Sequence, residues 1–172
     1  MRKMAWLLGL LLSTAGMAHG QAHEEPSVEV FGGPSVLRNG ATAPSFSLYG
    51  GWQTEGSFNF GAHAGATADF GGQYRSISGT RVSQYEYLFG PRVMARAHRA
   101  TLFAHVLIGG NTFHAAGGTS TNGFAMGMGG GLDYNVGRRF AIRAIQADYI
   151  RTRLSTTWFN DARLGLGVVF KF

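Results

Sequence analysis

The sequence contains no cysteine, four prolines and nine acidic residues against 15 lysines and arginines. Without cysteine, neither a disulfide nor a thiolate metal site can stabilise the fold. The basic residues are scattered and form no stripe, so nucleic acid is not an expected partner. The 27 glycines follow no collagen-like repeat, and an aromatic content of 13% argues against disorder. A folded protein with some other source of stability is therefore expected.

Long apolar runs are also scarce, and the first one has the three parts of a secretory signal peptide. Arg2 and Lys3 are positive, apolar and small residues follow over 5–18, and "MAHGQA" offers small residues for cleavage. Cleavage after Gly20 or after Ala22 fits this pattern, and we favour Ala22. No other stretch approaches the roughly 18 to 20 apolar residues of a membrane helix. We therefore expect an exported chain without such a helix.

From Ser27 onward, apolar and polar residues alternate with a period of two, which is typical of strands whose two faces meet different surroundings. Each segment has about ten residues, the length that crosses a bilayer at a tilt. The predicted strands cover residues 27–38, 49–60, 64–75, 84–98, 101–110, 123–134, 140–153 and 163–172.

The seventh strand departs from plain alternation. Arg143 has odd parity, whereas Gln146 and Asp148 have even parity. One extra residue between Arg143 and Gln146 would return all three polar side chains to one face. We therefore predict a β-bulge there.

The connections predict how the strands are joined. Those after the second, fourth and sixth strands are short ("FGAH", "HRA", "NVGRR"), and the other four are longer. This alternation is typical of up-and-down outer-membrane barrels, with both chain termini on the periplasmic side. The expected fold class is therefore all-β: an eight-stranded antiparallel up-and-down transmembrane β-barrel over residues 23–172, preceded by a signal peptide over 1–22.

A membrane barrel reverses the usual burial pattern, because apolar residues face lipid and polar residues face the lumen. Eight strands leave an interior about wide enough for side chains to fill. Unpaired charges would be costly there, so we expect acids and bases to pair into a network that plugs the lumen. The predicted lumen charge network comprises Glu29, Glu55, Asp69, Glu86, Arg92, Arg96, His105, Asp133, Arg143, Asp148, Arg163 and Lys171.

Two stretches, "MGGGLDYNVGRRFAIRAIQADYIRTR" and the terminal "VVFKF", resemble the small eight-stranded outer-membrane barrels of the outer-membrane-protein-A transmembrane type, a superfamily that includes opacity proteins. The resemblance covers essentially the whole mature chain. It implies an inward acid on each strand of the penultimate hairpin, matching Asp133 and Asp148. It also implies an assembly signal at Phe170 and Phe172, read by the barrel-assembly machinery.

The same resemblance implies the outer membrane of a Gram-negative-type envelope as the location. Outer-membrane lipid, periplasmic chaperones and the assembly machinery are then the expected partners. The sequence departs from the family in the one-residue irregularity of the seventh strand, and no peptidoglycan-binding domain follows Phe172. A role as a cell-wall tether is not expected.

Catalysis is the main rival class, because a barrel enzyme needs a serine or acid near a histidine at the membrane rim. No motif ties such residues together here, and only His114 clearly shares the outer end with the candidate serines. We therefore expect no enzyme, and no catalytic, cofactor or metal residues; His105 is interpreted as a lumen histidine bonded to an acid. The residues weighed are His63, His98, His105, His114, Ser76, Ser78, Ser120 and Ser155.

The expected function is an integral outer-membrane protein with a structural or surface-interaction role. Two alternatives remain: a surface adhesin or ligand binder acting through the outer loops, and a narrow passive pore. Phe113 and Trp158 in those loops could meet a partner, but we interpret them first as anchors at the lipid interface. A lipid-modifying barrel enzyme is the least favoured alternative, and the sequence names no extracellular ligand.

Overall fold

The computed structural model describes residues 28–40, 47–77, 79–115, 118 and 120–172. The predicted signal peptide and its cleavage site lie outside the described residues. Among the described residues, no helix has the length and apolar character needed to cross a membrane.

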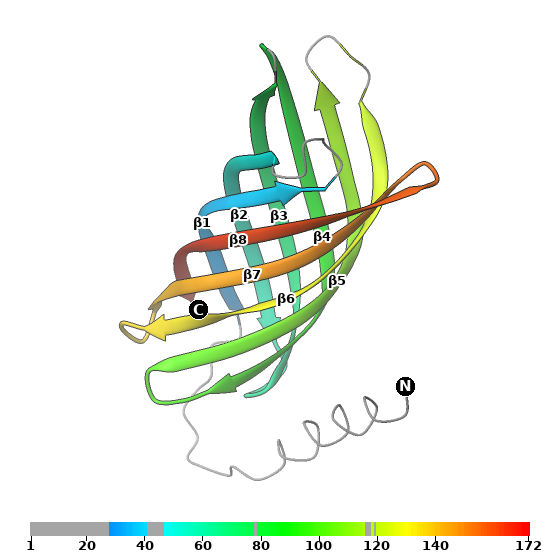
Figure 1. Cartoon of the computed structure of the whole chain (residues 1–172). Coiled ribbons are helices and arrows are strands. Elements are labelled where there is room, and N and C mark those ends of the chain that lie inside the picture. Colours follow the sequence, from blue (N-terminus) through cyan, green and yellow to red (C-terminus); the bar gives the residue numbers. More distant parts are fainter. Residues whose placement is uncertain (1–27, 41–46, 78, 116–117, 119) are drawn as a thin grey trace, which may run out of the picture.

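Eight antiparallel strands form one closed barrel, confirming the predicted fold class (Figure 1). Neighbours in sequence are neighbours in the sheet, and β1 pairs with β8 to close it. Closure pairs the backbone groups of every strand on both sides, which is what a sheet needs if it is to lie in hydrocarbon. The strands are β1 (Val28–Asn39), β2 (Ser47–Asn59), β3 (Ala64–Ile77), β4 (Thr80–Arg96), β5 (Ala100–Ala115), β6 (Thr121–Asn135), β7 (Phe140–Leu154) and β8 (Thr157–Lys171).

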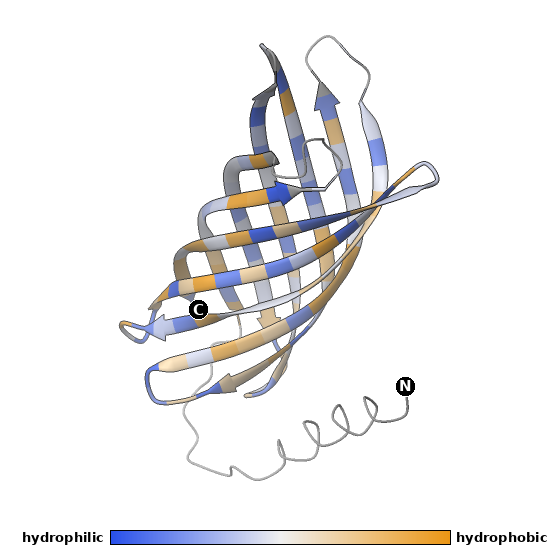
Figure 2. Cartoon of the chain, in the orientation of Figure 1, coloured by the Kyte–Doolittle hydropathy of each residue, from blue (hydrophilic) through white to orange (hydrophobic). Residues whose placement is uncertain are grey.

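Hydrophobic and hydrophilic residues alternate along the strands (Figure 2). The polar members of the alternation are buried inside the barrel, and large apolar side chains lie exposed on its outer surface. On the outer surface, for example, Val106 and Leu164 are 58% and 57% exposed. On the inner faces of the strands, Asp69 and Arg143 are 0% exposed. The molecule is thus apolar outside and polar inside, as expected for a barrel in a membrane.

The irregularity predicted in β7 is present. The pairing of β7 with β8 shifts between Arg143 and Gln146, and Ala144 and Ile145 both lie exposed on the outer surface. The side chains of Arg143 and Gln146 therefore both point into the lumen, together with that of Asp148.

The first residue of β1, Val28, and the last residue of the chain, Phe172, meet at one end of the barrel, which we call the terminal end. The Val28 amide donates to the Phe172 carbonyl at 3.3 Å, and the Phe172 amide donates to the Val28 carbonyl at 2.9 Å. The β2–β3, β4–β5 and β6–β7 connections lie at this end, and the strands β1, β3, β5 and β7 run from it to the opposite end (Figure 1).

The expected difference in loop length does not hold for two of the four connections at the opposite end. β3 ends at Ile77 and β4 begins at Thr80, while β7 ends at Leu154 and β8 begins at Thr157. Segments that we interpreted as loops are instead extensions of the strands. Polar and apolar residues do not alternate regularly in these segments, so their pattern is hard to distinguish from that of a loop.

Backbone conformation explains these tight turns. Gly79 has φ of 82° and Ser155 has φ of 55°, the left-handed values that two-residue hairpin connections require. Paired strands therefore project beyond the body of the barrel as hairpins (Figure 1).

The lumen is not polar throughout, because apolar clusters lie on both sides of its charged residues. Along the inner face of β7, Ala141 belongs to one cluster and Ile150 to the other, and Arg143, Gln146 and Asp148 lie between them. The cluster at the terminal end comprises Phe31, Ala141 and Val169, and the other comprises Leu37, Tyr49, Leu88, Leu107, Ala125 and Ile150.

Candidate functional site

The charged residues in the lumen form two joined groups, the first of them around Arg163. Its guanidinium contacts three carboxylates from three other strands: Nη2 lies 2.7 Å from Asp69 and 2.8 Å from Asp148, and Nη1 lies 3.2 Å from Glu86. Arg163 itself is 1% exposed. One arginine on β8 thus ties β3, β4 and β7 together across the lumen.

The second group contains two arginines. Arg92 Nη1 lies 3.0 Å from Glu29 and 3.5 Å from Glu55, and its Nη2 lies 3.6 Å from Asp133. Arg143 lies 2.8 Å from Asp133 and 3.3 Å from Glu55. Because each of these two acids contacts both arginines, the group is a network and not a set of isolated pairs.

Aromatic rings complete the surroundings of these two arginines. The Arg143 guanidinium carbon lies 4.2 Å from the ring centroids of both Phe31 and Phe103, and that of Arg92 lies 4.3 Å from Phe103. A cation over an aromatic face is stabilised, the more so when water is excluded. The period-two pattern gives no sign of these contacts, since it assigns each residue a face and no partner.

His105 joins the two groups. Its Nε2 lies 2.9 Å from Asp148 of the Arg163 group, and its Nδ1 lies 3.9 Å from Glu55 of the other group. The structure thus places this histidine beside acids in the lumen, and among the described residues no group of three or more metal-binding side chains is present.

Arg96 and Lys171 lie at the edge of the network. Arg96 contacts Glu29 at 3.3 Å and donates to the Ala62 carbonyl at 2.7 Å, while Lys171 donates to the Asn135 side chain at 2.5 Å. The structure therefore brings all the residues named for the lumen network inside the barrel, where all but Arg96 are buried.

One lumen acid was missed by the sequence analysis. Asp161 is 1% exposed and accepts a hydrogen bond from the Gly40 amide at 2.8 Å. It was placed in a loop, yet it has the same parity as Arg163 two residues later. Extending the eighth strand by that parity would have found it.

Glycines on the inner faces make room for these side chains. A Cβ at Gly129 would lie 2.1 Å from the Asp148 carboxylate, and a Cβ at Gly131 would lie 2.8 Å from the Phe103 ring. The glycine-rich inner face of β6 is therefore the surface against which Asp148 of β7 and Phe103 of β5 pack.

On the outer surface, the residues proposed as an assembly signal lie at the terminal end. Phe170 packs edge-on against Phe140 with ring centroids 5.1 Å apart, and Phe172 is 71% exposed. The two chain-end rings therefore belong to the aromatic residues at that rim of the barrel.

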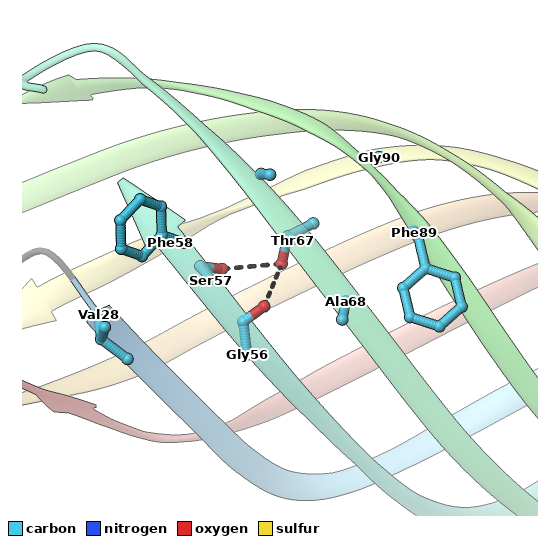
Figure 3. A pocket seen from close by; sticks show the side chains of 9 residues that line it. Val28, Gly56, Ser57, Phe58, Thr67, Ala68, Phe89 and Gly90 are labelled. Carbon is cyan, nitrogen blue, oxygen red and sulfur yellow. Dashed lines mark hydrogen bonds between the residues drawn. The ribbon is translucent and has the colours of Figure 1, made fainter. Parts of the chain in front are cut away.

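The outer surface also has a shallow hollow of about 520 Å³ across β2, β3 and β4 (Figure 3). The rings of Phe58 and Phe89 flank it, and small residues such as Ala68 lie between them. Ser57 and Thr67, whose hydroxyl oxygens are 2.8 Å apart, are hydrogen-bonded to each other beneath this surface. Its lining is apolar, as expected for a surface that faces lipid chains.

One candidate serine and one candidate histidine do meet. Ser120 Oγ lies 2.7 Å from His114 Nδ1, beside the Tyr85 ring. A catalytic triad would also need a carboxylate next to the histidine. Every aspartate and glutamate side chain in the described part of the chain is buried within the barrel, so the described residues do not complete a triad there.

The fold is shared with solved outer-membrane barrels. Neisserial surface protein A aligns with a TM-score of 0.67 at 13% identity, covering 85% of this chain and 97% of that one. Ail, the attachment invasion locus protein of Yersinia pestis, aligns with a TM-score of 0.59 at 19% identity, covering 86% and 99%. The N-terminal barrel domain of Pseudomonas aeruginosa OprF aligns with a TM-score of 0.56 at 12% identity, covering 86% and 98%.

Comparison with models of protein families finds no match, and comparison with curated protein sequences finds none either. At these identities the structural similarity establishes the fold. The chain therefore has the fold of an integral outer-membrane β-barrel.

Proposed function

We propose that this chain is an integral outer-membrane protein of a Gram-negative-type envelope, with a structural or surface-interaction role and no catalytic activity. The observation that carries the proposal is the pairing of an apolar outer surface with a lumen filled by interlocked charges, in which Arg92 and Arg163 each contact three carboxylates. The barrel is surrounded by outer-membrane lipid, and its terminal end faces the periplasm.

A filled lumen predicts that the barrel does not conduct. Protein refolded into a planar lipid bilayer is expected to give no discrete current steps under an applied voltage, because the charged side chains occupy the cross-section. The measurement is single-channel recording, with insertion checked by protection from protease. Reproducible steps from inserted protein would favour the narrow passive pore instead.

We also propose that Phe170 and Phe172 form the signal read by the barrel-assembly machinery. Deletion of Phe172 is expected to lower the amount of barrel in the outer membrane several-fold. The purified variant should still fold in detergent, because only two backbone hydrogen bonds of the chain end involve this residue. Quantitative immunoblotting of membrane fractions measures the first effect, and the gel mobility of the folded form measures the second.

The matched control is Phe172→Tyr, which keeps an aromatic ring at the last position. It should assemble at the normal level. Normal membrane levels of the deletion variant would show that Phe172 is not needed as a signal.

A second candidate function is binding of an anionic ligand at the cell surface. A hollow of about 500 Å³ at the β3–β4 hairpin is lined by Tyr74, Arg75, Ser76 and Arg81. Two arginines in one hollow suit a sulfated or phosphorylated ligand. Ail has been solved in complex with the heparin analogue sucrose octasulfate, and that structure covers 86% of this chain at 19% identity with a TM-score of 0.52.

The test is binding of the refolded barrel to immobilised heparin. The double variant R75Q/R81Q is expected to bind several-fold more weakly than the unchanged protein. The control R138Q/R139Q removes the same charge from the β6–β7 turn at the opposite end and should bind normally. Equal loss in both variants would indicate attraction by net charge without a site.

A further inference from the structure

The charges of this barrel are divided by sign between its two surfaces. Every acidic side chain in the described ranges is buried in the lumen, with an exposed fraction of 5% or less. Arginines, by contrast, are also found exposed outside, as Arg81, Arg151 and Arg153 are. Within the described ranges, the outer surface therefore has positive side chains and no negative side chain to neutralise them.

Two of these arginines share one tryptophan on the outer face of the β7–β8 hairpin. The guanidinium carbon of Arg151 lies 4.7 Å from the centroid of the Trp158 ring, and that of Arg153 lies 5.7 Å from it. Arg153 is directly paired with Trp158 in the sheet, and Arg151 with Asn160. The Arg153 Nε also donates to the Ser155 carbonyl at 3.2 Å. Both guanidinium groups are thus held beside the same ring.

Tyr149 marks the level of Arg151 and Arg153 along the barrel axis, because it lies two residues before Arg151 on the same outer face of β7. The Tyr149 hydroxyl donates to the Asn160 side chain at 2.7 Å, and the ring is 45% exposed. Below it on β8 the outward residues Leu164 and Leu166 are each 57% exposed. Tyrosine and tryptophan mark the boundary between hydrocarbon and headgroups. The two arginines therefore lie at the level of the lipid headgroups.

We infer that Arg151 and Arg153, held beside Trp158, bind the phosphate of an anionic lipid headgroup in the outer leaflet. This inference rests on the proposed location in the outer membrane. Within the described residues no acidic side chain lies beside either arginine, so an anion from the surroundings is the counter-charge that this inference assigns to them. A guanidinium presents paired N–H donors that match phosphate oxygens, and two of them side by side suit one phosphate group.

The headgroup is favoured over a soluble phosphate because of the site's position. The ligand would lie against the outside of the barrel, directly above apolar residues that contact acyl chains. A lipid brings its phosphate to this height and its chains to the surface below, whereas a free phosphate gains only the ionic contacts. Arg92, Arg143 and Arg163 in the lumen do not offer the same site, because each already contacts carboxylates.

The test uses the fluorescence of Trp158. Of the tryptophans after the predicted signal peptide only Trp52 and Trp158 remain, so a Trp52→Phe background reports on Trp158 alone. This protein is placed in phosphatidylcholine nanodiscs containing increasing fractions of phosphatidic acid, and its emission is recorded. We expect a saturable change. The half-saturating fraction should rise about thirtyfold in R151Q/R153Q, because each arginine near an anionic surface contributes about fivefold.

Two controls separate the site from general attraction. R138Q/R139Q removes the same charge from the β6–β7 turn and should leave the titration unchanged. Inorganic phosphate, added to protein in pure phosphatidylcholine, should leave Trp158 emission unchanged. The inference is overturned if emission does not respond to phosphatidic acid, if R151Q/R153Q responds as the unchanged protein does, or if inorganic phosphate reproduces the response.

Failure of this inference is distinguishable from failure of the proposed function. Each nanodisc sample is checked for a folded, inserted barrel by its gel mobility without heating and by protection from protease. Inserted protein that ignores phosphatidic acid refutes the headgroup site alone. A chain that does not insert into any of the bilayers refutes the membrane location itself.

Discussion

Replacement of Arg163 by methionine is expected to lower the free energy of unfolding of the barrel by about 3–5 kcal/mol, because it leaves buried charges without a partner. Asp69, Glu86 and Asp148 all lie within 3.2 Å of this guanidinium. Methionine fills much of the same volume, so the loss reports on charge and not on a cavity. Urea titration of the barrel in lipid vesicles, followed by tryptophan fluorescence, measures the change.

The matched control is Arg81→Met, the same substitution at an exposed arginine of the β3–β4 hairpin. Its effect on unfolding should stay within about 0.5 kcal/mol, as for most surface changes. The double variant R163M/D148N should be less destabilised than the two single effects added together, because one of the stranded charges is also removed. An R163M barrel as stable as the control would show that the network does not hold the strands together.

Replacement of Gly129 by valine is expected to cost about 3 kcal/mol of unfolding free energy, at the upper end of what overpacking usually costs. A Cβ at this position would lie 2.1 Å from the Asp148 carboxylate and 2.6 Å from the Ala147 carbonyl oxygen. Asp148 would have to leave its places beside Arg163 and His105, so the substitution damages both halves of the network. The same urea titration measures it.

Gly32→Val is the control, because a Cβ at Gly32 has no other atom within 4 Å. Both substitutions put a β-branched residue into a strand, so their difference isolates the crowding inside the lumen. Equal stabilities of the two variants would mean that the interior yields to the added side chain and that Asp148 finds other partners.

Period-two alternation predicted the eight strands and the inward side of each strand, and the strand and connection lengths added the prediction of a closed up-and-down barrel. Alternation is a local property of the sequence, and within a strand it assigns each residue to the inner or the outer face. Even the irregular strand was predictable, because Arg143 and Gln146 would otherwise lie on opposite faces.

The partners across the lumen were not predictable in the same way. Which acid meets Arg163 depends on the tilt and stagger of strands that lie far apart in sequence, and parity contains neither quantity. The apolar cluster around Leu107 and the rings of Phe31 and Phe103 beside the arginines were missed for the same reason. Asp161 was missed because the predicted eighth strand starts at Arg163, whereas β8 starts at Thr157, and polar and apolar residues do not alternate over the first residues of β8.

The irregular pairing in β7 has a consequence for how this sequence tolerates change in length. Arg143 and Gln146 pair with Gly167 and Gly165, so two residues of β7, Ala144 and Ile145, stand opposite the single Leu166. In the pairing with β6, Asp133 lies opposite Arg143 and Leu132 lies opposite Ile145, so Ala144 has no partner on β6. Loss of Ala144 would therefore leave every other rung of both ladders intact and every side chain on its present face. Most one-residue deletions inside a strand invert the faces beyond them, but β7 has a position where a codon can be lost without that inversion.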